Sequence, residues 1–247
     1  MTEQNDKIIG ILGGMGSEAT AALFSLIIEN TDAHNDHEHA PVLIYNNPKI
    51  PDRSAYLLGY GSNPVPLLIE GSRKLEIMGA SCILWPCNTA HYFAEEVQKH
   101  LSVPVIHMIR ETAVYVRSAF PSGTRFGLLA TEGTYKTELY RDIFAEEGVD
   151  LLVPSEKNKE ITMISIYGEK GIKAGYHKEP VEMLQAPLRE LRDHGADVVI
   201  AGCTELSLVL NPRTTGMDVL DPMRILARAA IRFVQYPLKD EQPFDLI

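Results

Sequence analysis

Two cysteines stand in similar small, polar, turn-like settings in the two halves of the chain. Cys87 lies in Trp-Pro-Cys-Asn-Thr-Ala-His and Cys203 in Ala-Gly-Cys-Thr-Glu-Leu, each just after a short apolar run. The residues that follow offer backbone amides, an amide side chain or hydroxyls: Asn88, Thr89 and Thr204. A thiol at the start of a helix has a lowered pKa, and the same amides can hold a substrate carboxylate. If the two thiols face each other across a cleft, they supply an acid and a base on opposite sides of one carbon atom.

Two other residues bear on this chemistry. Cys82 lies inside an apolar run, where a cysteine behaves as a small buried hydrophobe. A cysteine hydrolase would need one thiol paired with a histidine, and His91 on the segment after Cys87 is a weak candidate for that partner. We therefore predict that Cys87 and Cys203 act together and that Cys82 is structural.

A cationic side chain precedes each of the two cysteines at a similar interval. Arg53 lies in Ile-Pro-Asp-Arg-Ser and Lys173 in Gly-Ile-Lys-Ala-Gly, both segments with the composition of loops. A surface cation is ordinarily only a solvated charge, but this parallel favours binding of a dicarboxylate, for which the arginine fork offers bidentate contact. Thr131 and Thr134, in Leu-Leu-Ala-Thr-Glu-Gly-Thr, add hydroxyl donors in another predicted turn.

A glycine-rich turn follows the first apolar run of the chain, at residues 10–20. Its Gly-x-Gly-x-x-Ala spacing matches a dinucleotide-binding fingerprint, which also requires an acid at the end of the second strand. That strand ends here in Tyr-Asn-Asn, at residues 45–47, without an acid. We favour a turn around Met15 that lets a small anion approach backbone amides at a helix N-terminus.

Three histidines, His34, His37 and His39, form a dense cluster with two acids, as a metal site would. The segment lies between a predicted helix and a predicted strand, where solvated loop residues are common, and the sequence has no matching ligand set elsewhere. We predict a loop and no metal.

Composition favours a cytoplasmic globular enzyme. The chain has 247 residues, 45% hydrophobic and 23% charged, enough for one large domain or two small ones. A net charge of −10 argues against a nucleic-acid or membrane surface, and no apolar run is long enough to span a bilayer. The polar, acidic N-terminal residues resemble neither a secretory signal nor a transit peptide. Three cysteines without Cys-x-x-Cys spacing suggest neither disulfides nor structural zinc.

Short apolar runs alternate with stretches of helical periodicity along the chain. Strands are predicted at 7–12, 42–45, 82–85, 105–108, 125–130, 151–153 and 198–201. Helices are predicted at 18–29, 66–78, 90–100, 135–147, 179–194 and 223–234. This alternation predicts an α/β fold with parallel sheets covered by helices, and ligands then bind at the carboxyl ends of the strands.

The pattern runs twice. We predict two similar parallel-sheet α/β domains related by pseudo-twofold symmetry, with the active site in the cleft between them. The first covers residues 1–110 and is completed by 210–247, and the second covers 111–209. Each half then carries one motif cysteine at the end of a strand.

These motifs resemble those of the aspartate/glutamate racemase family. The resemblance lies in residues 10–20, 51–53, 86–91, 127–134 and 202–206, which span nearly the whole chain in the expected order. The sequence departs from the family at three points. Ser17 stands where the family often has proline, and Gly-Cys-Thr-Glu stands where dedicated glutamate racemases have Gly-Cys-Thr-His. The first glycine turn also lacks their Asp-Ser-Gly. The last two favour the aspartate or broader branch.

The resemblance implies a cofactor-independent enzyme, without metal, in which Cys87 and Cys203 act as base and acid. It also implies that Arg53 and Lys173 clamp the side-chain carboxylate and that the protein is a homodimer. The complete predicted substrate-binding set is Met15, Arg53, Asn88, Thr89, Thr131, Lys173 and Thr204. The substrate is an acidic amino acid, aspartate or glutamate, and the sequence leaves the preference open.

Two kinds of rival function remain at this point. Maleate isomerases and arylmalonate decarboxylases share the resemblance, and the decarboxylases use one cysteine, so the presence of both favours racemisation. A catalytically silent amino-acid or dicarboxylate binding protein would use the glycine turn and Arg53 while the thiols do nothing.

Overall fold

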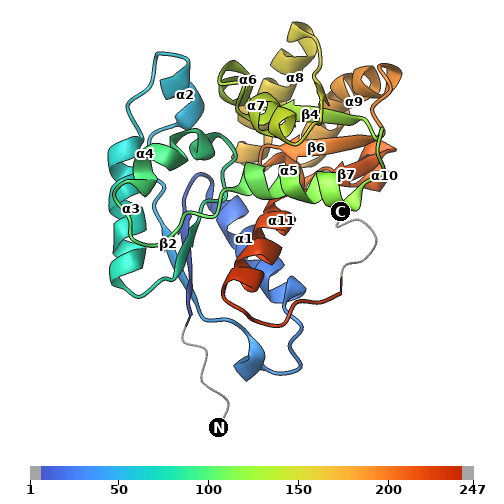
Figure 1. Ribbon diagram of the computed structural model, residues 1–247. Helices are drawn as coiled ribbons and strands as arrows, with labels where there is room; N and C mark the ends of the chain where they lie inside the picture. Colours follow the sequence, from blue (N-terminus) through green and yellow to red (C-terminus); the bar gives the residue numbers. More distant parts are fainter. Residues whose placement is uncertain (1–6, 241–247) are drawn as a thin grey trace.

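The strands form two separate parallel sheets, as the computed structural model describes them over residues 7–240 (Figure 1). The first sheet has the order β2-β1-β3, from β1 (Ile9–Gly13), β2 (Val42–Asn46) and β3 (Cys82–Leu84). The second has the order β5-β4-β6-β7, from β4 (Phe126–Ala130), β5 (Leu151–Leu152), β6 (Val198–Gly202) and β7 (Asp218–Leu220). The predicted α/β fold class, with two parallel-sheet halves, is confirmed.

The central strand of each sheet is buried along its whole length. All residues of β1, β4 and β6 are buried, which explains why they appear in the sequence as short continuous apolar runs. Parallel pairing aligns the strands so that Gly13 lies opposite Asn46, and Ala130 opposite Gly202. The carboxyl ends of neighbouring strands therefore meet at one edge of each sheet.

Helices cover the sheets. Four of them, α1, α3, α9 and α11, begin within one residue of the predicted positions, whereas α5 and α8 were not predicted. The longer ones are α1 (Ser17–Asn30), α3 (Val65–Ile77), α5 (Met108–Ala119), α7 (Leu139–Glu146), α8 (Glu156–Tyr167), α9 (Lys178–Asp193) and α11 (Pro222–Phe233). Short ones are α2 (Arg53–Leu57), α4 (Ala94–Gln98), α6 (Glu132–Lys136) and α10 (Pro212–Thr215). Single 3-10 turns are η1 (Asp36–Glu38), η2 (Thr89–Phe93), η3 (Ile172–Ala174) and η4 (Leu206–Leu208).

Two helices, α5 and α11, join the sheets (Figure 1). Met108 of α5 and Leu226 of α11 pack into the core around β1, whereas Ile109 and Ile225 pack into the core around β4. α11 is buried almost all round, and its Arg228 donates a 3.1 Å hydrogen bond to Asn30 Oδ1 on α1. The hydrophobic cores of the two halves are therefore connected through α5 and α11.

The division into domains 1–110 with 210–247 and 111–209 stays a proposal. The packing of α11 against α1 supports the return of the chain to the first half. β7 lies after residue 209 and pairs with β6, so that strand belongs to the second sheet.

Three predicted elements are wrong in detail. Residues 105–108 form no full strand: Val105 makes one parallel bridge to Ile83, and α5 begins because His107 Nδ1 accepts a 3.3 Å hydrogen bond from the amide of Arg110. The predicted helix at 90–100 is a 3-10 turn followed by α4. The predicted helix at 135–147 breaks at Glu138, whose φ of 54° is left-handed, between α6 and α7.

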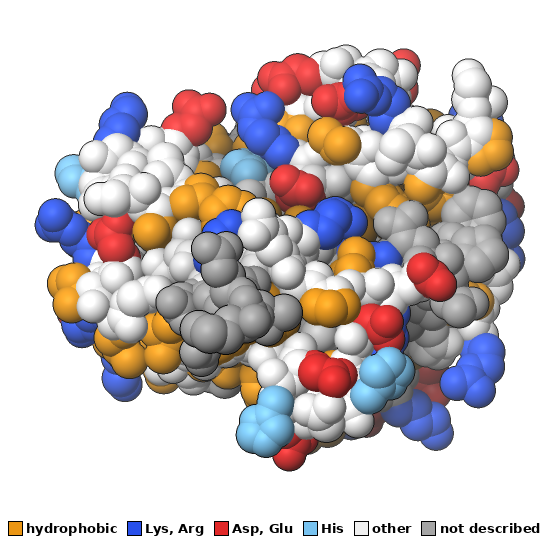
Figure 2. Space-filling view, turned by 60° about the horizontal axis from the view of Figure 1, so that its bottom comes forward, with side chains coloured by type: hydrophobic (Ala, Val, Ile, Leu, Met, Phe, Trp, Pro, Cys, Tyr) orange, Lys and Arg blue, Asp and Glu red, His pale blue; other side chains and the backbone are white. Residues whose placement is uncertain are grey.

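The charged residues of the chain are spread over the surface. On the face drawn in Figure 2, basic and acidic side chains are interspersed rather than gathered by sign. The histidine cluster lies in the loop around η1, where Glu38 accepts hydrogen bonds from the amide of His34 and from Asn35. Within residues 7–240, no helix is both long and apolar enough to cross a membrane.

We expect Leu226→Ala to lower the free energy of unfolding by about 2–5 kcal/mol, because it empties a fully buried site in the helix that joins the sheets. Denaturant unfolding measures this change. Arg232→Ala, at an exposed position of the same helix, is the control. An equal effect of both substitutions would contradict the packing described here.

Candidate active site

The two motif cysteines follow strands in equivalent places: β3 lies next to β1 in the first sheet, and β6 lies next to β4 in the second. Cys203 comes directly after β6, and Cys87 follows β3 by a short turn. Both are nearly buried, with exposed fractions of 7% and 6%. Neither stands at the start of an α-helix, because the segments that follow are only 3-10 turns.

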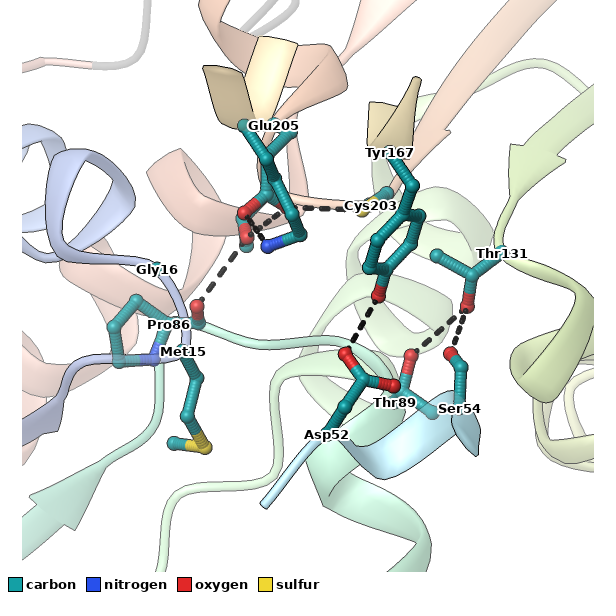
Figure 3. Close-up of polar contacts among 12 residues, drawn as sticks. Met15, Gly16, Asp52, Ser54, Pro86, Thr89, Thr131, Tyr167, Cys203 and Glu205 are labelled. Carbon is teal, nitrogen blue, oxygen red and sulfur yellow. Dashed lines mark hydrogen bonds and ion pairs between the residues drawn. The ribbon is translucent and has the colours of Figure 1, made fainter. Parts of the chain in front are cut away.

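Cys203 forms a hydrogen bond with a carboxylate. Its Sγ donates to Glu205 Oε2 at 3.0 Å, and the hydroxyl of Thr204 donates to the same oxygen and to the carbonyl of Pro86, both at 3.3 Å (Figure 3). Burial and the negative charge of Glu205 raise the pKa of the Cys203 thiol well above its usual value, although the charge of Lys173 opposes this. The expectation that a helix start lowers the pKa is therefore wrong for Cys203.

Lys173 is held by the same carboxylate. Its Nζ forms an ion pair with Glu205 Oε1 and lies 5.4 Å from the centre of the Tyr167 ring. Burial alone would lower the pKa of Lys173, but the charges of Glu205 and Cys203 raise it, so the ammonium stays charged. A Cβ atom at Gly16 would lie 3.2 Å from Glu205 Oε1, so the glycine turn packs directly against this ion pair.

Arg53 lies on the other side, beside Cys87. Its Nη2 donates to the carbonyl of Met15, and its Nη1 to that of Pro51, both at 3.0 Å. Burial would lower the pKa of Arg53, but interaction with negative charge at Cys87 and at Asp52 raises it. Arg53 thus ties the glycine turn to α2, and two of its nitrogens already have backbone partners.

Tyr167 connects the surroundings of the two thiols. Its hydroxyl donates to Asp52 Oδ2 at 3.1 Å (Figure 3). Burial, together with the charges of Cys203, Asp52 and Cys87, raises the pKa of Tyr167 far above its usual value. Lys173 is likewise within electrostatic reach of both thiols. The two cysteines therefore share neighbours.

A cluster of hydroxyls joins the two halves of the chain. Thr89 Oγ1 lies 3.1 Å from Thr131 Oγ1 and 2.9 Å from Thr134 Oγ1, and Ser54 Oγ donates to Thr131 at 3.1 Å (Figure 3). All four residues are buried. A Cβ at Gly133 would meet Ser54 Oγ at 2.8 Å, so this close approach requires glycine there.

Asn88 and His91 complete the setting of Cys87. Asn88 Oδ1 accepts a 2.5 Å hydrogen bond from the Tyr140 hydroxyl, while its buried Nδ2 has no partner. His91 Nδ1 lies 2.9 Å from the carbonyl oxygen of Cys87, and burial lowers the pKa of this histidine to about 4. His91 therefore positions the backbone of Cys87 as a neutral imidazole. This arrangement does not support the Cys-His pair of a hydrolase.

The predicted site residues come together in these contacts, with one difference for Met15, whose side chain packs in the core while its carbonyl binds Arg53. Sequence reasoning missed several further groups: Asp52, Ser54, Tyr140, Tyr167 and Glu205. Glu205 and Asp52 adjoin predicted residues and could have been found from their motifs. Tyr140 and Tyr167 lie far from any motif, and no sequence signal marks them.

Comparison with known proteins identifies the family. A family model described as Asp/Glu/Hydantoin racemase matches residues 12–230. The chain belongs to this family. It is therefore an isomerase, a racemase.

Individual relatives cover nearly the whole chain. The broad specificity amino-acid racemase RacX of Bacillus subtilis is 27% identical over 234 residues, which cover 91% of this chain and 96% of the relative. The structure of Picrophilus torridus aspartate racemase has 29% identity and a TM-score of 0.83, covering 94% of this chain and 96% of that one. A glutamate racemase of Pediococcus pentosaceus is 27% identical over 200 residues, 74% of this racemase and 73% of the relative.

We expect Thr131→Val to destabilise this racemase by about 1–3 kcal/mol, because it leaves the buried hydroxyl of Ser54 without its partner and removes one of the two partners of Thr89. Thermal unfolding measures the change, with Thr124→Val at a more exposed position as the control. Equal melting temperatures for the two variants would show that the hydroxyl cluster does not join the halves.

Proposed function

We propose that this racemase interconverts the enantiomers of an acidic amino acid, aspartate or glutamate, by proton transfer between Cys87 and Cys203 without a cofactor. The observation that carries the proposal is the contact between the two cysteine motifs: the hydroxyl of Thr204, next to Cys203, donates to the carbonyl of Pro86, next to Cys87, at 3.3 Å. Lys173 and Tyr167 are also within electrostatic reach of both thiols. Two thiols that follow strands of different sheets and share these neighbours suit proton transfer on opposite faces of one carbon.

The chemistry requires one thiolate and one thiol at a time. The thiolate removes the Cα proton from one face, and the thiol returns a proton to the other. Negative charge then develops on the substrate α-carboxylate, where hydrogen-bond donors stabilise it. The unpartnered Asn88 Nδ2 is a suitable donor, together with the backbone amides next to the two cysteines.

The acidic substrate class is supported by charge. Lys173 and Arg53 are the cations that flank the thiols, and both stay charged, Arg53 although it is buried and Lys173 because Glu205 pairs with it. A distal substrate carboxylate would share Lys173 with Glu205, or displace Glu205 from it. Relatives named as aspartate and glutamate racemases agree with this class, whereas the name of the RacX relative indicates a broader one. A homodimeric state and a cytoplasmic location stay predictions from the sequence.

Exchange of the Cα proton with heavy water tests the function directly. With L-aspartate or L-glutamate, we expect deuterium at Cα together with formation of the D enantiomer, detected by NMR and chiral chromatography. Binding of these amino acids without exchange would identify a binding protein. Conversion of maleate, without exchange of either amino acid, would identify the isomerase alternative.

Removal of either motif cysteine tests the two-base step. Cys87→Ala and Cys203→Ala should each reduce racemisation by at least about a thousand-fold while the fold survives, because the acid or the base is then missing. Cys82→Ala is the matched control: burial raises the pKa of Cys82 to about 12, and this thiol lies in the core of β3. Full activity in either motif variant would contradict the mechanism.

A further inference from the structure

We propose that Glu205 is a positioning residue that holds Cys203 in its thiol form, so that the resting enzyme carries its proton on Cys203 and is ready for the enantiomer whose Cα proton Cys87 removes. The inference deepens the proposed function and rests on it. It assigns different resting states to two cysteines whose sequence motifs look alike.

The contacts of Glu205 carry the proposal. Its Oε2 accepts the Cys203 S–H and the Thr204 hydroxyl, and its Oε1 pairs with Lys173. Glu205 is only 5% exposed, so little water competes for these bonds. A carboxylate with an ammonium on one oxygen stays ionised, and an ionised carboxylate can only accept from the sulfur. The arrangement therefore requires hydrogen on Cys203.

Four charged or titratable groups face Cys203 from the elements around it: Glu205, Lys173, Tyr167 and Tyr140. Burial raises the pKa of both tyrosines, so they stay neutral. Lys173 is the one cation of this set, and Glu205 already neutralises it. A thiolate at Cys203 would thus lie beside a carboxylate and away from any uncompensated positive charge.

Cys87 has the opposite surroundings. Its charge interacts with Arg53, a guanidinium that cannot lose its proton. Burial raises the cost of leaving a charge unpaired, and a thiolate beside Arg53 supplies a counter-ion. A thiol at position 203 therefore satisfies Glu205 while Lys173 stays paired with the same carboxylate.

The proton balance of one turnover follows from this resting state. The Cys87 thiolate takes the Cα proton and becomes a thiol, while Cys203 gives its proton to the opposite face and becomes a thiolate. The Glu205 carboxylate repels that new thiolate. Uptake of a proton by Cys203 and release of one by Cys87, both exchanged with water, restore the resting state with no net change.

Alkylation of the free enzyme by iodoacetamide tests the proposal without relying on racemisation. The rate of modification of the Cys203 peptide is followed by mass spectrometry as a function of pH. We expect Glu205→Gln to lower the midpoint pH of this reaction by about one unit or more, because a neighbouring negative charge and an acceptor for the thiol are lost. Lys173→Gln should shift the midpoint upward, because the carboxylate is then uncompensated.

Two further variants make the result decisive. Glu205→Asp keeps the charge and should keep the midpoint above that of Glu205→Gln. Glu70→Gln removes another lysine-paired glutamate, at the exposed Glu70–Lys74 ion pair, and should leave the midpoint unchanged. An unchanged or raised midpoint in Glu205→Gln would overturn the proposal, as would shifts in the same direction for Glu205→Gln and Lys173→Gln.

The pH profile of racemisation supplies the functional arm. The alkaline limb reports loss of the acid, so Glu205→Gln should move that limb to lower pH, whereas a purely structural role would lower activity at all pH values alike. If the variants shift the Cys203 alkylation midpoint as expected but the wild-type enzyme does not racemise the amino acids, only the proposed function is contradicted. If the wild-type enzyme racemises the amino acids but Glu205→Gln does not shift the midpoint pH of Cys203 alkylation, only the proposed role of Glu205 is contradicted.

Discussion

The buried carboxylate of Glu205 imposes the main constraint on this site. A charge at 5% exposure is unfavourable unless partners surround it, and here an ammonium, a thiol and a hydroxyl occupy its two oxygens. These partners come from η3 and from the segment after β6. The turn before α1 must also be narrow enough for Gly16 to approach the pair. Glu205 therefore constrains three segments: the charge at η3, the donors after β6 and the size of the residue in the turn before α1.

The same need for partners explains how the two halves meet. Thr204 donates to the Pro86 carbonyl, Tyr167 to Asp52, and Ser54 to Thr131, so polar contacts cross between the halves on several sides of the thiols. Behind these contacts, α5 and α11 fill the apolar cores of both sheets. The polar contacts fix the relative positions of the cysteines, and the shared helices supply the burial that makes those contacts strong.

Much of the fold could be predicted because a strand buried on both faces is a continuous apolar run. β1, β4 and β6 are of this kind, and the cysteine motifs directly follow such strands. Prediction failed where a single side chain overrides periodicity. The His107 cap begins α5 inside a predicted strand. Tyr135 donates to the Leu128 carbonyl and so binds α6 to β4, after which the left-handed Glu138 separates α6 from α7.

The site could be predicted as a set of residues but not as a set of pairings. Similar motifs suggested that Cys87 and Cys203 are equivalent, and similar spacing suggested that Arg53 and Lys173 both wait for a substrate carboxylate. In the structure, Lys173 already has a carboxylate, and two nitrogens of Arg53 bind backbone carbonyls. One residue, Glu205, causes the difference at Cys203, since it both engages the lysine and accepts the thiol proton. Any dicarboxylate that recruits Lys173 must therefore change the surroundings of Cys203 at the same time. In the proposed mechanism, this couples recognition of the substrate side chain to Cys203, the proposed acid.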